Sequence, residues 1–183
     1  MVEPKPAMRL SWLVDVLRQQ QATGFADFAG AHASATVPVS DRLATRLIAD
    51  HLPPSAPVRD VDLRASDGNV VTVALRLAKP AILPRFEIPI HIEQQPRLPE
   101  QPVFVFRVAL PLGLSAIAGP ALRIFELLPP GVRLQDGRLT VDLRPLLQHY
   151  HAAEALDFVD RLEVTTVDGA ILVRIDARVM PVS

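Results

Sequence analysis

Fifteen consecutive residues without a charge, from Val108 to Leu122, constrain the fold of this chain more than any other feature. The stretch is too short to span a bilayer, which needs about 20 apolar residues, and Pro111 and Pro120 interrupt it. The apolar residues from Leu112 to Leu128 almost encircle a helix, and a helix that is apolar on most sides is buried. The sequence therefore predicts a very apolar segment held inside a protein domain.

Composition narrows the classes of protein that this chain can belong to. Its 183 residues are enough for one domain with a large core, and 49% of them are hydrophobic but only 5% aromatic, so the core is built mostly from aliphatic residues. A formal net charge of −1, with the charges mixed along the chain, gives no basic surface for nucleic acid. The absence of cysteine excludes disulfides, thiolate metal sites and cysteine nucleophiles.

The segments on either side of the apolar stretch alternate apolar and polar residues, which predicts half-buried β-strands. The clearest pair joins Val61–Ala65 to Val71–Leu77 through a turn at Ser66–Asn69. A third strand runs from Phe86 to Ile92, and Pro89 within it indicates an edge strand or a bulge.

Later segments extend this pattern. Val103–Leu110 is apolar on both faces except at Arg107, which predicts a central strand covered on both sides. We further expect a hairpin within Val132–Leu143 that turns at Asp136–Gly137, a helix from Pro145 to about Asp160, and a last hairpin that turns at Asp168–Gly169 and joins Leu162–Thr166 to Ile171–Val179.

The N-terminal part predicts two helices and an edge strand. Residues 8–22 form an amphipathic helix that docks on the domain or contacts a partner or a membrane surface, so residues 1–24 are an appendage to a single domain at 25–183. His32–Val39 is an edge strand, and Ser40 caps a helix that Pro53-Pro54 ends. The first apolar stretch, Leu10–Leu17, contains Asp15 and lacks a signal-peptide cleavage site, so we expect the cytoplasm, or the cell envelope if the natural N-terminus is longer.

No group of residues predicts a reaction or a metal site. His149 and His151 stand two apart on the expected helix, so they point to different sides and cannot share a metal, although His151 and Glu154 could meet. We expect His149 to be a hydrogen-bonded core residue, and His51 to be packed or at a helix end. Ser115 lies outside any G-x-S-x-G motif, and Asp60 and Asp62 share a solvated strand face with Arg64. An enzyme acting on a hydrophobic substrate would need His149 or His151 beside a carboxylate.

The order of elements carries a resemblance to a known family. A capped helix from Ser40 to Leu52, the hairpin Asp-Gly-Asn-Val-Val-Thr-Val-Ala-Leu-Arg-Leu, further alternating strands and an apolar helix resemble bacterial members of the tubular lipid-binding (TULIP-like) superfamily over about residues 32–144. The resemblance implies a long helix wrapped by a curved antiparallel sheet, with lipid bound in the groove between them, and it implies no catalytic residues. Many bacterial relatives are exported or lipid-anchored; here we expect no signal peptide, and the sequence has no cysteine, so the resemblance does not imply a role in the cell envelope.

We therefore predict an α+β domain in which a curved antiparallel sheet wraps the central apolar helix Leu112–Leu128, with flanking helices. The predicted function is non-enzymatic binding or transport of a lipid or other hydrophobic small molecule, without a cofactor; a membrane surface and a second copy are possible partners. The alternative is a protein interaction or scaffold module that uses edge strands and the N-terminal helix. The predicted apolar lining of the groove is Phe86, Ile88, Ile90, Phe104, Phe106, Leu114, Ile117, Leu122 and Phe125.

Overall fold

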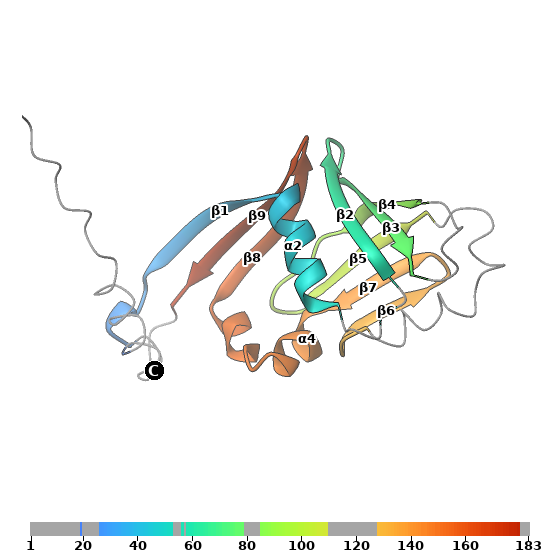
Figure 1. The fold of residues 1–183 in the computed structure, drawn as a ribbon. Helices are drawn as coiled ribbons and strands as arrows, with labels where there is room; N and C mark the ends of the chain where they lie inside the picture. The colour runs from blue at the N-terminus through green and yellow to red at the C-terminus, as the bar shows by residue number, and fades with distance from the viewer. Residues whose placement is uncertain are drawn as a thin grey trace, which may run out of the picture.

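The computed structural model describes residues 26–52, 56, 58–78, 85–109 and 128–179, together with residue 19. This part of the chain is an α+β structure made of two antiparallel sheets and two α-helices (Figure 1). The elements in chain order are η1 (Ala26–Phe28), β1 (His32–Ser40), α2 (Asp41–His51), β2 (Val58–Ser66), β3 (Val70–Leu77), β4 (Phe86–Gln94), β5 (Val103–Val108), β6 (Val132–Gln135), β7 (Arg138–Asp142), α4 (Leu143–His149), η3 (Ala153–Asp157), β8 (Val159–Val167) and β9 (Ala170–Arg178).

The smaller sheet has the strand order β1-β9-β8, so the N-terminal and C-terminal strands of the described chain lie side by side. β1 is an edge strand, as the sequence predicts, and it pairs with β9 along its whole length, from His32 opposite Arg178 to Ser40 opposite Ala170. The predicted turn at Asp168–Gly169 joins β8 to β9, and Gly169 adopts a φ of +77° there.

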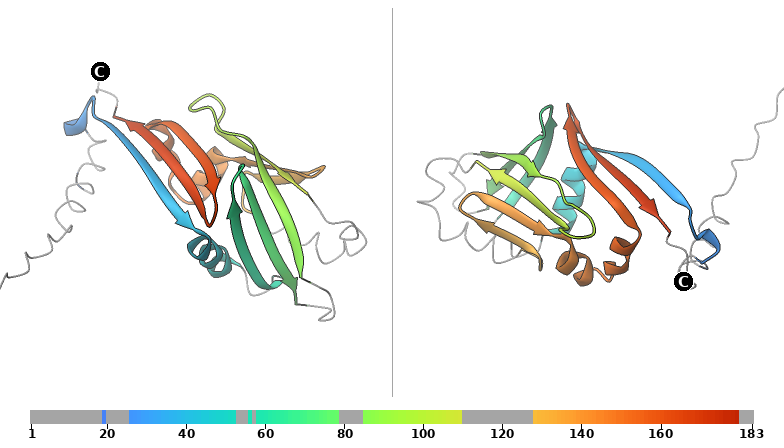
Figure 2. Two further views of the ribbon diagram at one scale, coloured as in Figure 1. Left: turned by 90° about the horizontal axis from the view of Figure 1, so that it is seen from above. Right: turned by 180° about the vertical axis from the view of Figure 1, so that it is seen from behind.

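The larger sheet has the strand order β2-β3-β4-β5-β7-β6. The predicted hairpin turns are confirmed: Gly68 and Asn69 have φ values of 82° and 63°, and Asp136 and Gly137 have values of 51° and 72°. Residues of this type tolerate the left-handed conformation that a tight hairpin requires. β2 and β7 run in clearly different directions in Figures 1 and 2, as expected for the cumulative twist of six strands.

Helix α2 lies beside β2, at the place where the two sheets meet (Figure 1). Ser40 caps it by accepting a hydrogen bond from the Leu43 amide, as predicted. Two side chains of α2 then satisfy the outward amides of β2: the Leu63 amide donates to Thr45 Oγ1 at 2.9 Å and the Ala65 amide to Asp41 Oδ1 at 2.9 Å. The helix therefore replaces the neighbouring strand that β2 lacks.

The β8–β9 hairpin completes the junction between the sheets. The Gly169 amide donates to the Ala65 carbonyl at 3.1 Å, and the Thr166 hydroxyl donates to the Ser66 carbonyl and accepts from the Val70 amide. The side-chain amide of Gln95 bonds Val164 twice: its nitrogen donates to the carbonyl at 2.6 Å and its oxygen accepts from the amide at 3.0 Å. The side chains of Thr166 and Gln95 thus bond backbone groups at the edges of the two sheets, where no strand of the other sheet pairs.

The expectation that Pro89 marks an edge or a bulge is wrong. β4 lies between β3 and β5, and the irregularity in its pairing falls between Ile92 and Gln94. The Pro89 carbonyl accepts from Ala109 at 2.9 Å, just beyond the last ladder pair of β4 and β5, so the missing Pro89 amide faces the place where that ladder ends. An interior strand tolerates proline at such a position because no ladder hydrogen bond is lost.

The predicted helix from Pro145 to about Asp160 is also wrong in its length. α4 begins at Leu143, where the Asp142 side chain accepts from the Arg144 amide, and Pro145 occupies the first turn, where its missing amide costs no helical bond. The helix ends at His149, because His151 takes a φ of +55°, and the shorter η3 follows.

Two predicted helices lie outside the described residues. The structure describes only Gln19 of the expected helix at 8–22 and only Leu128 of the segment Leu112–Leu128. The wrapped central helix and the N-terminal appendage therefore stay predictions.

We expect Gln95→Ala to lower the free energy of unfolding by about 1–3 kcal/mol, because it leaves a part-buried amide and carbonyl of β8 without partners. The measurement is urea unfolding followed by circular dichroism. Gln101→Ala is the matched control, since the bonds of Gln101 to Arg97 are made by its backbone. Equal unfolding midpoints for the two variants would contradict the role given to Gln95.

Candidate functional site

The strand register of the larger sheet places apolar side chains from all six strands on one face. Residues directly opposite each other in an antiparallel pair point to the same side, so the pairs can be followed from β2 to β6. We call this side the apolar face. Its members are Val61, Leu63, Ala65, Val71, Val73, Leu75, Leu77, Phe86, Ile88, Ile90, Ile92, Phe104, Phe106, Val108, Val132, Leu134, Leu139 and Val141.

The apolar face is more buried than the opposite face, yet its side chains are incompletely covered. Five of its members are buried: Leu63, Ala65, Leu77, Ile88 and Phe104. The remaining members are half-buried. Its most deeply buried large side chains are Leu77, at 3% exposed, and Phe104, at 5%. In a close-packed core most apolar side chains are buried, so the described residues do not by themselves fill the space over this face.

The opposite face of the larger sheet is polar and carries ion pairs. Asp62 lies 2.7 Å from Arg85 and 3.4 Å from Arg64, as measured between Oδ2 and the guanidinium nitrogens. Glu93 pairs with Arg107 and Arg138. The expectation of a solvated face at Asp62 is thus confirmed. The ion pair of Asp62 with Arg85, which precedes β4, could not be predicted from the alternation of residues in β2.

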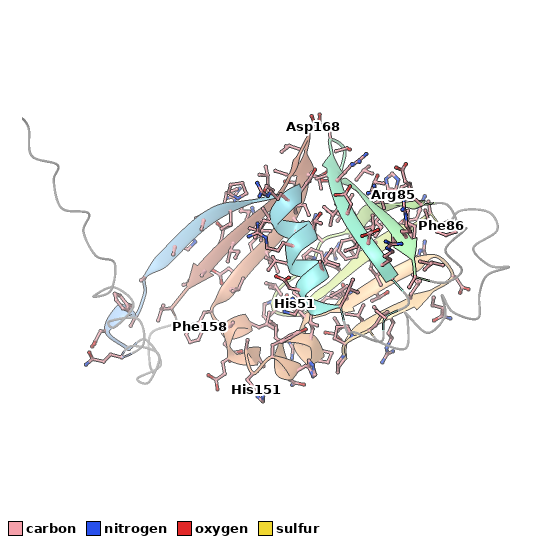
Figure 3. All side chains as sticks on the ribbon, in the orientation of Figure 1. His51, Arg85, Phe86, His151, Phe158 and Asp168 are labelled. Carbon is pink, nitrogen blue, oxygen red and sulfur yellow. The ribbon has the colours of Figure 1, made fainter. Side chains whose placement is uncertain are left out.

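Five of the nine predicted lining residues come together on the apolar face. Phe86, Ile88 and Ile90 stand on β4, and Phe104 and Phe106 stand beside them on β5, with ring centroids 5.7 Å apart. Figure 3 marks Phe86 at the start of its strand. The other four, Leu114, Ile117, Leu122 and Phe125, lie outside the described residues.

The expectation for Val103–Leu110 is only half right. β5 is a central strand, between β4 and β7, and Phe104 is 5% exposed on its apolar side. Its other side is only partly covered, since Val103 and Val105 are half-buried and Arg107 is exposed. Neighbouring strands on both edges make β5 central in the sheet, but they do not cover its faces.

The histidines do not form a site with the apolar face. His149 is exposed, with its ring edge-on to Tyr150, so the expectation of a core histidine is wrong; α4 ends there and leaves it in solvent. Figure 3 shows His151 at the turn after α4 and His51 at the end of α2, where its Nδ1 lies 2.7 Å from the Leu47 carbonyl. Among the residues that the structure describes, no group of three His, Asp or Glu side chains could hold a metal ion.

A second polar cluster lies on the smaller sheet, around Asp176. The Ser34 hydroxyl donates to Asp176 Oδ1 at 2.5 Å, and Arg174 and Arg161 lie 3.5 and 3.9 Å from Oδ2. The hydrogen bond from Ser34 is the main cause of a pKa of Asp176 below its ordinary value of 3.8; the arginines act in the same direction and burial opposes them. The cluster ties β1, β9 and β8 together. The sequence shows only an outward Arg-x-Asp-x-Arg alternation, which gives no hint of Ser34.

An open depression of about 540 Å³ lies away from the predicted lining residues. It is formed by Leu128, Pro129, Pro130, Gly131, Val132 and Pro145 together with Val103, Arg133, Thr140 and Asp142. Of its strand residues only Val132 belongs to the apolar face, and the others lie on the polar side of the sheet, so the depression opens mainly on the polar side.

Comparison of the chain with models of protein families, with curated proteins and with solved structures found no match. In the described part of the chain, no helix has both the length and the apolar character needed to cross a membrane.

We expect Asp176→Asn to destabilise the protein at neutral pH and to lose this effect in acid. A carboxylate whose folded-state pKa is lowered contributes stability above its unfolded pKa, near 3.8, and this contribution is lost as the pH falls through the folded-state pKa. The measurement is the difference between the unfolding midpoints of the wild type and of Asp176→Asn, taken at several pH values between 7 and 2. Asp168→Asn, in the β8–β9 turn, is the control, because it removes a carboxylate outside this cluster. A difference between the midpoints that stays constant over this pH range would contradict the stabilising role given to the Asp176 carboxylate.

Proposed function

We propose that this protein binds a lipid-like hydrophobic molecule against the apolar face and carries or senses it without catalysing a reaction. One observation carries the proposal: apolar side chains continue across six strands, and most of them are only half-buried. A surface of this kind is stabilised when something apolar covers it. In the proposal, the segment Leu112–Leu128 covers part of the face and the ligand covers the rest.

The energetics of such a site favour long hydrocarbon chains. Each methylene removed from water contributes about 0.8 kcal/mol, so a chain of many methylenes binds tightly without polar recognition. The apolar face supports this mode of binding because none of its members is polar. The polar groups of the ligand would remain at the rim, in water or beside the ion pairs of the outer face.

The proposal agrees with the resemblance to tubular lipid-binding proteins, in which lipid lies between a helix and a curved sheet. It assigns no cofactor and no catalytic residue. We propose that it acts in the cytoplasm.

The direct test is native mass spectrometry of the purified chain before and after organic extraction, followed by titration with a fluorescent long-chain fatty acid. We expect co-purified hydrophobic molecules, and saturable binding of the probe by the extracted protein. A chain that carries no such molecule and does not bind the probe would remove the proposal.

We expect Ile90→Gln to raise the dissociation constant of the fluorescent fatty acid about tenfold. Ile90 is half-buried on the apolar face, and an amide without a partner in an apolar site costs about 1–3 kcal/mol, where 1.4 kcal/mol is a factor of ten. His91→Gln is the matched control, since His91 is the next residue of β4 and points to the opposite, exposed face. Circular dichroism verifies that both variants fold. Equal affinities for the probe would place its site elsewhere.

A further inference from the structure

The two sheets have four outer edges, and three of them are protected. The β2 edge is bonded by Asp41 and Thr45 of α2 and by Gly169. The β8 edge is met at Val164 by Gln95. The β6 edge is four residues long and carries Arg133. Short length, charge and bonds from other elements are the usual means of preventing sheets from pairing with other chains.

The fourth edge, β1, has almost none of these protections. The strand is nine residues long, has no Asp, Glu, Lys or Arg and pairs with β9 without a bulge. All but one of its residues are exposed, and the exposed fraction of Val37 is 47%. Within the described ranges, no hydrogen bond from another element reaches its outer edge. Figures 1 and 2 show β1 as the outermost strand of its sheet.

The register identifies which backbone groups of β1 are open. The Val179 amide donates to the Ala31 carbonyl and the Asp41 amide to the Gly169 carbonyl, so the odd-numbered residues face β9. Because the groups alternate in an antiparallel ladder, the amides and carbonyls of His32, Ser34 and Thr36 point outward. Pro38 also faces outward, and its missing amide ends the run of donors.

We propose that this edge pairs with β1 of a second copy of the chain, in antiparallel register centred on Ser34. In that register His32 of each copy lies opposite Thr36 of the other, the amides of His32, Ser34 and Thr36 each find a carbonyl, and Pro38 and Ser40 lie outside the paired run. The strand carries no charge that would repel an identical strand, and the exposed Ala33, Ala35 and Val37 of the two copies form one apolar strip. Two three-stranded sheets then join into one of six strands.

The protected edges explain why the assembly closes at two copies. A chain with one open edge forms an isologous dimer around a twofold axis, and the dimer then offers no second open edge for growth. An identical strand fits this edge because β1 carries no Asp, Glu, Lys or Arg and because its open amides and carbonyls are complementary to themselves in this register. This inference is independent of ligand binding, since β1 belongs to the smaller sheet and the apolar face to the larger one.

The test is the mass of the full chain by light scattering or sedimentation over a range of concentrations, combined with amide hydrogen exchange. We expect a dimer whose formation slows the exchange of the His32, Ser34 and Thr36 amides at least about tenfold relative to the dilute, monomeric chain. We expect Ala35→Lys to raise the dimer dissociation constant at least about tenfold, because a lysine on an edge strand opposes pairing. Val167→Lys, at an exposed valine of β8, is the matched control and leaves the dimer unchanged.

Several results would overturn the proposal. A wild-type chain that stays monomeric at the highest concentration reached excludes it. A dimer in which the three amides exchange as fast as in the monomer, or that Ala35→Lys leaves intact, has its interface elsewhere. Slow exchange of these amides in a monomeric chain means that another part of the same chain covers the edge. The exchange measurement needs no substitution, so it decides the matter even if a variant does not fold.

Discussion

The structure depends on how the open edge of β2 is satisfied. Sheet edges expose backbone amides and carbonyls that need partners, and here the partners are side chains and the amide of a turn residue rather than another strand. Asp41 and Thr45 of α2 bond β2 directly, and Gly169 and Thr166 of the β8–β9 hairpin bond β2 and the start of β3. Because α2 begins one residue after β1 ends, the same junction fixes the smaller sheet against the larger one.

The apolar face is only partly buried. Its side chains come from six strands, but among the large ones only Leu63, Leu77, Ile88 and Phe104 are buried. Charges gather on the other side of the sheet, where Glu93 and Asp62 each hold two arginines. The two faces therefore differ sharply in polarity, and this contrast underlies the proposal that a hydrophobic molecule occupies the apolar side.

The hairpins and strand faces were predictable because their signals are local. Gly68-Asn69 and Asp136-Gly137 adopt the left-handed conformation that tight turns demand, and the alternation of Phe86, Ile88 and Ile90 set their common face. The predictions for Pro89 and His149 were wrong because the surroundings of these residues depend on other parts of the structure. Pro89 is tolerated inside the sheet because β5 pairing stops beside it, and His149 is exposed because His151 ends its helix early. The roles of Gln95 and Ser34 also depend on partners 69 and 142 residues away.

The sequence alone determined which residues form strands, where the hairpins turn and which side chains share a face, because two-residue periodicity and turn chemistry act over a few residues. Only the tertiary structure decided that the strands divide into two sheets and which sheet edges receive hydrogen bonds from other elements of the described chain. Those outcomes rest on hydrogen bonds between backbone groups and side chains far apart in the chain, such as Thr45 with Leu63 and Gln95 with Val164, and no local pattern encodes such a pairing.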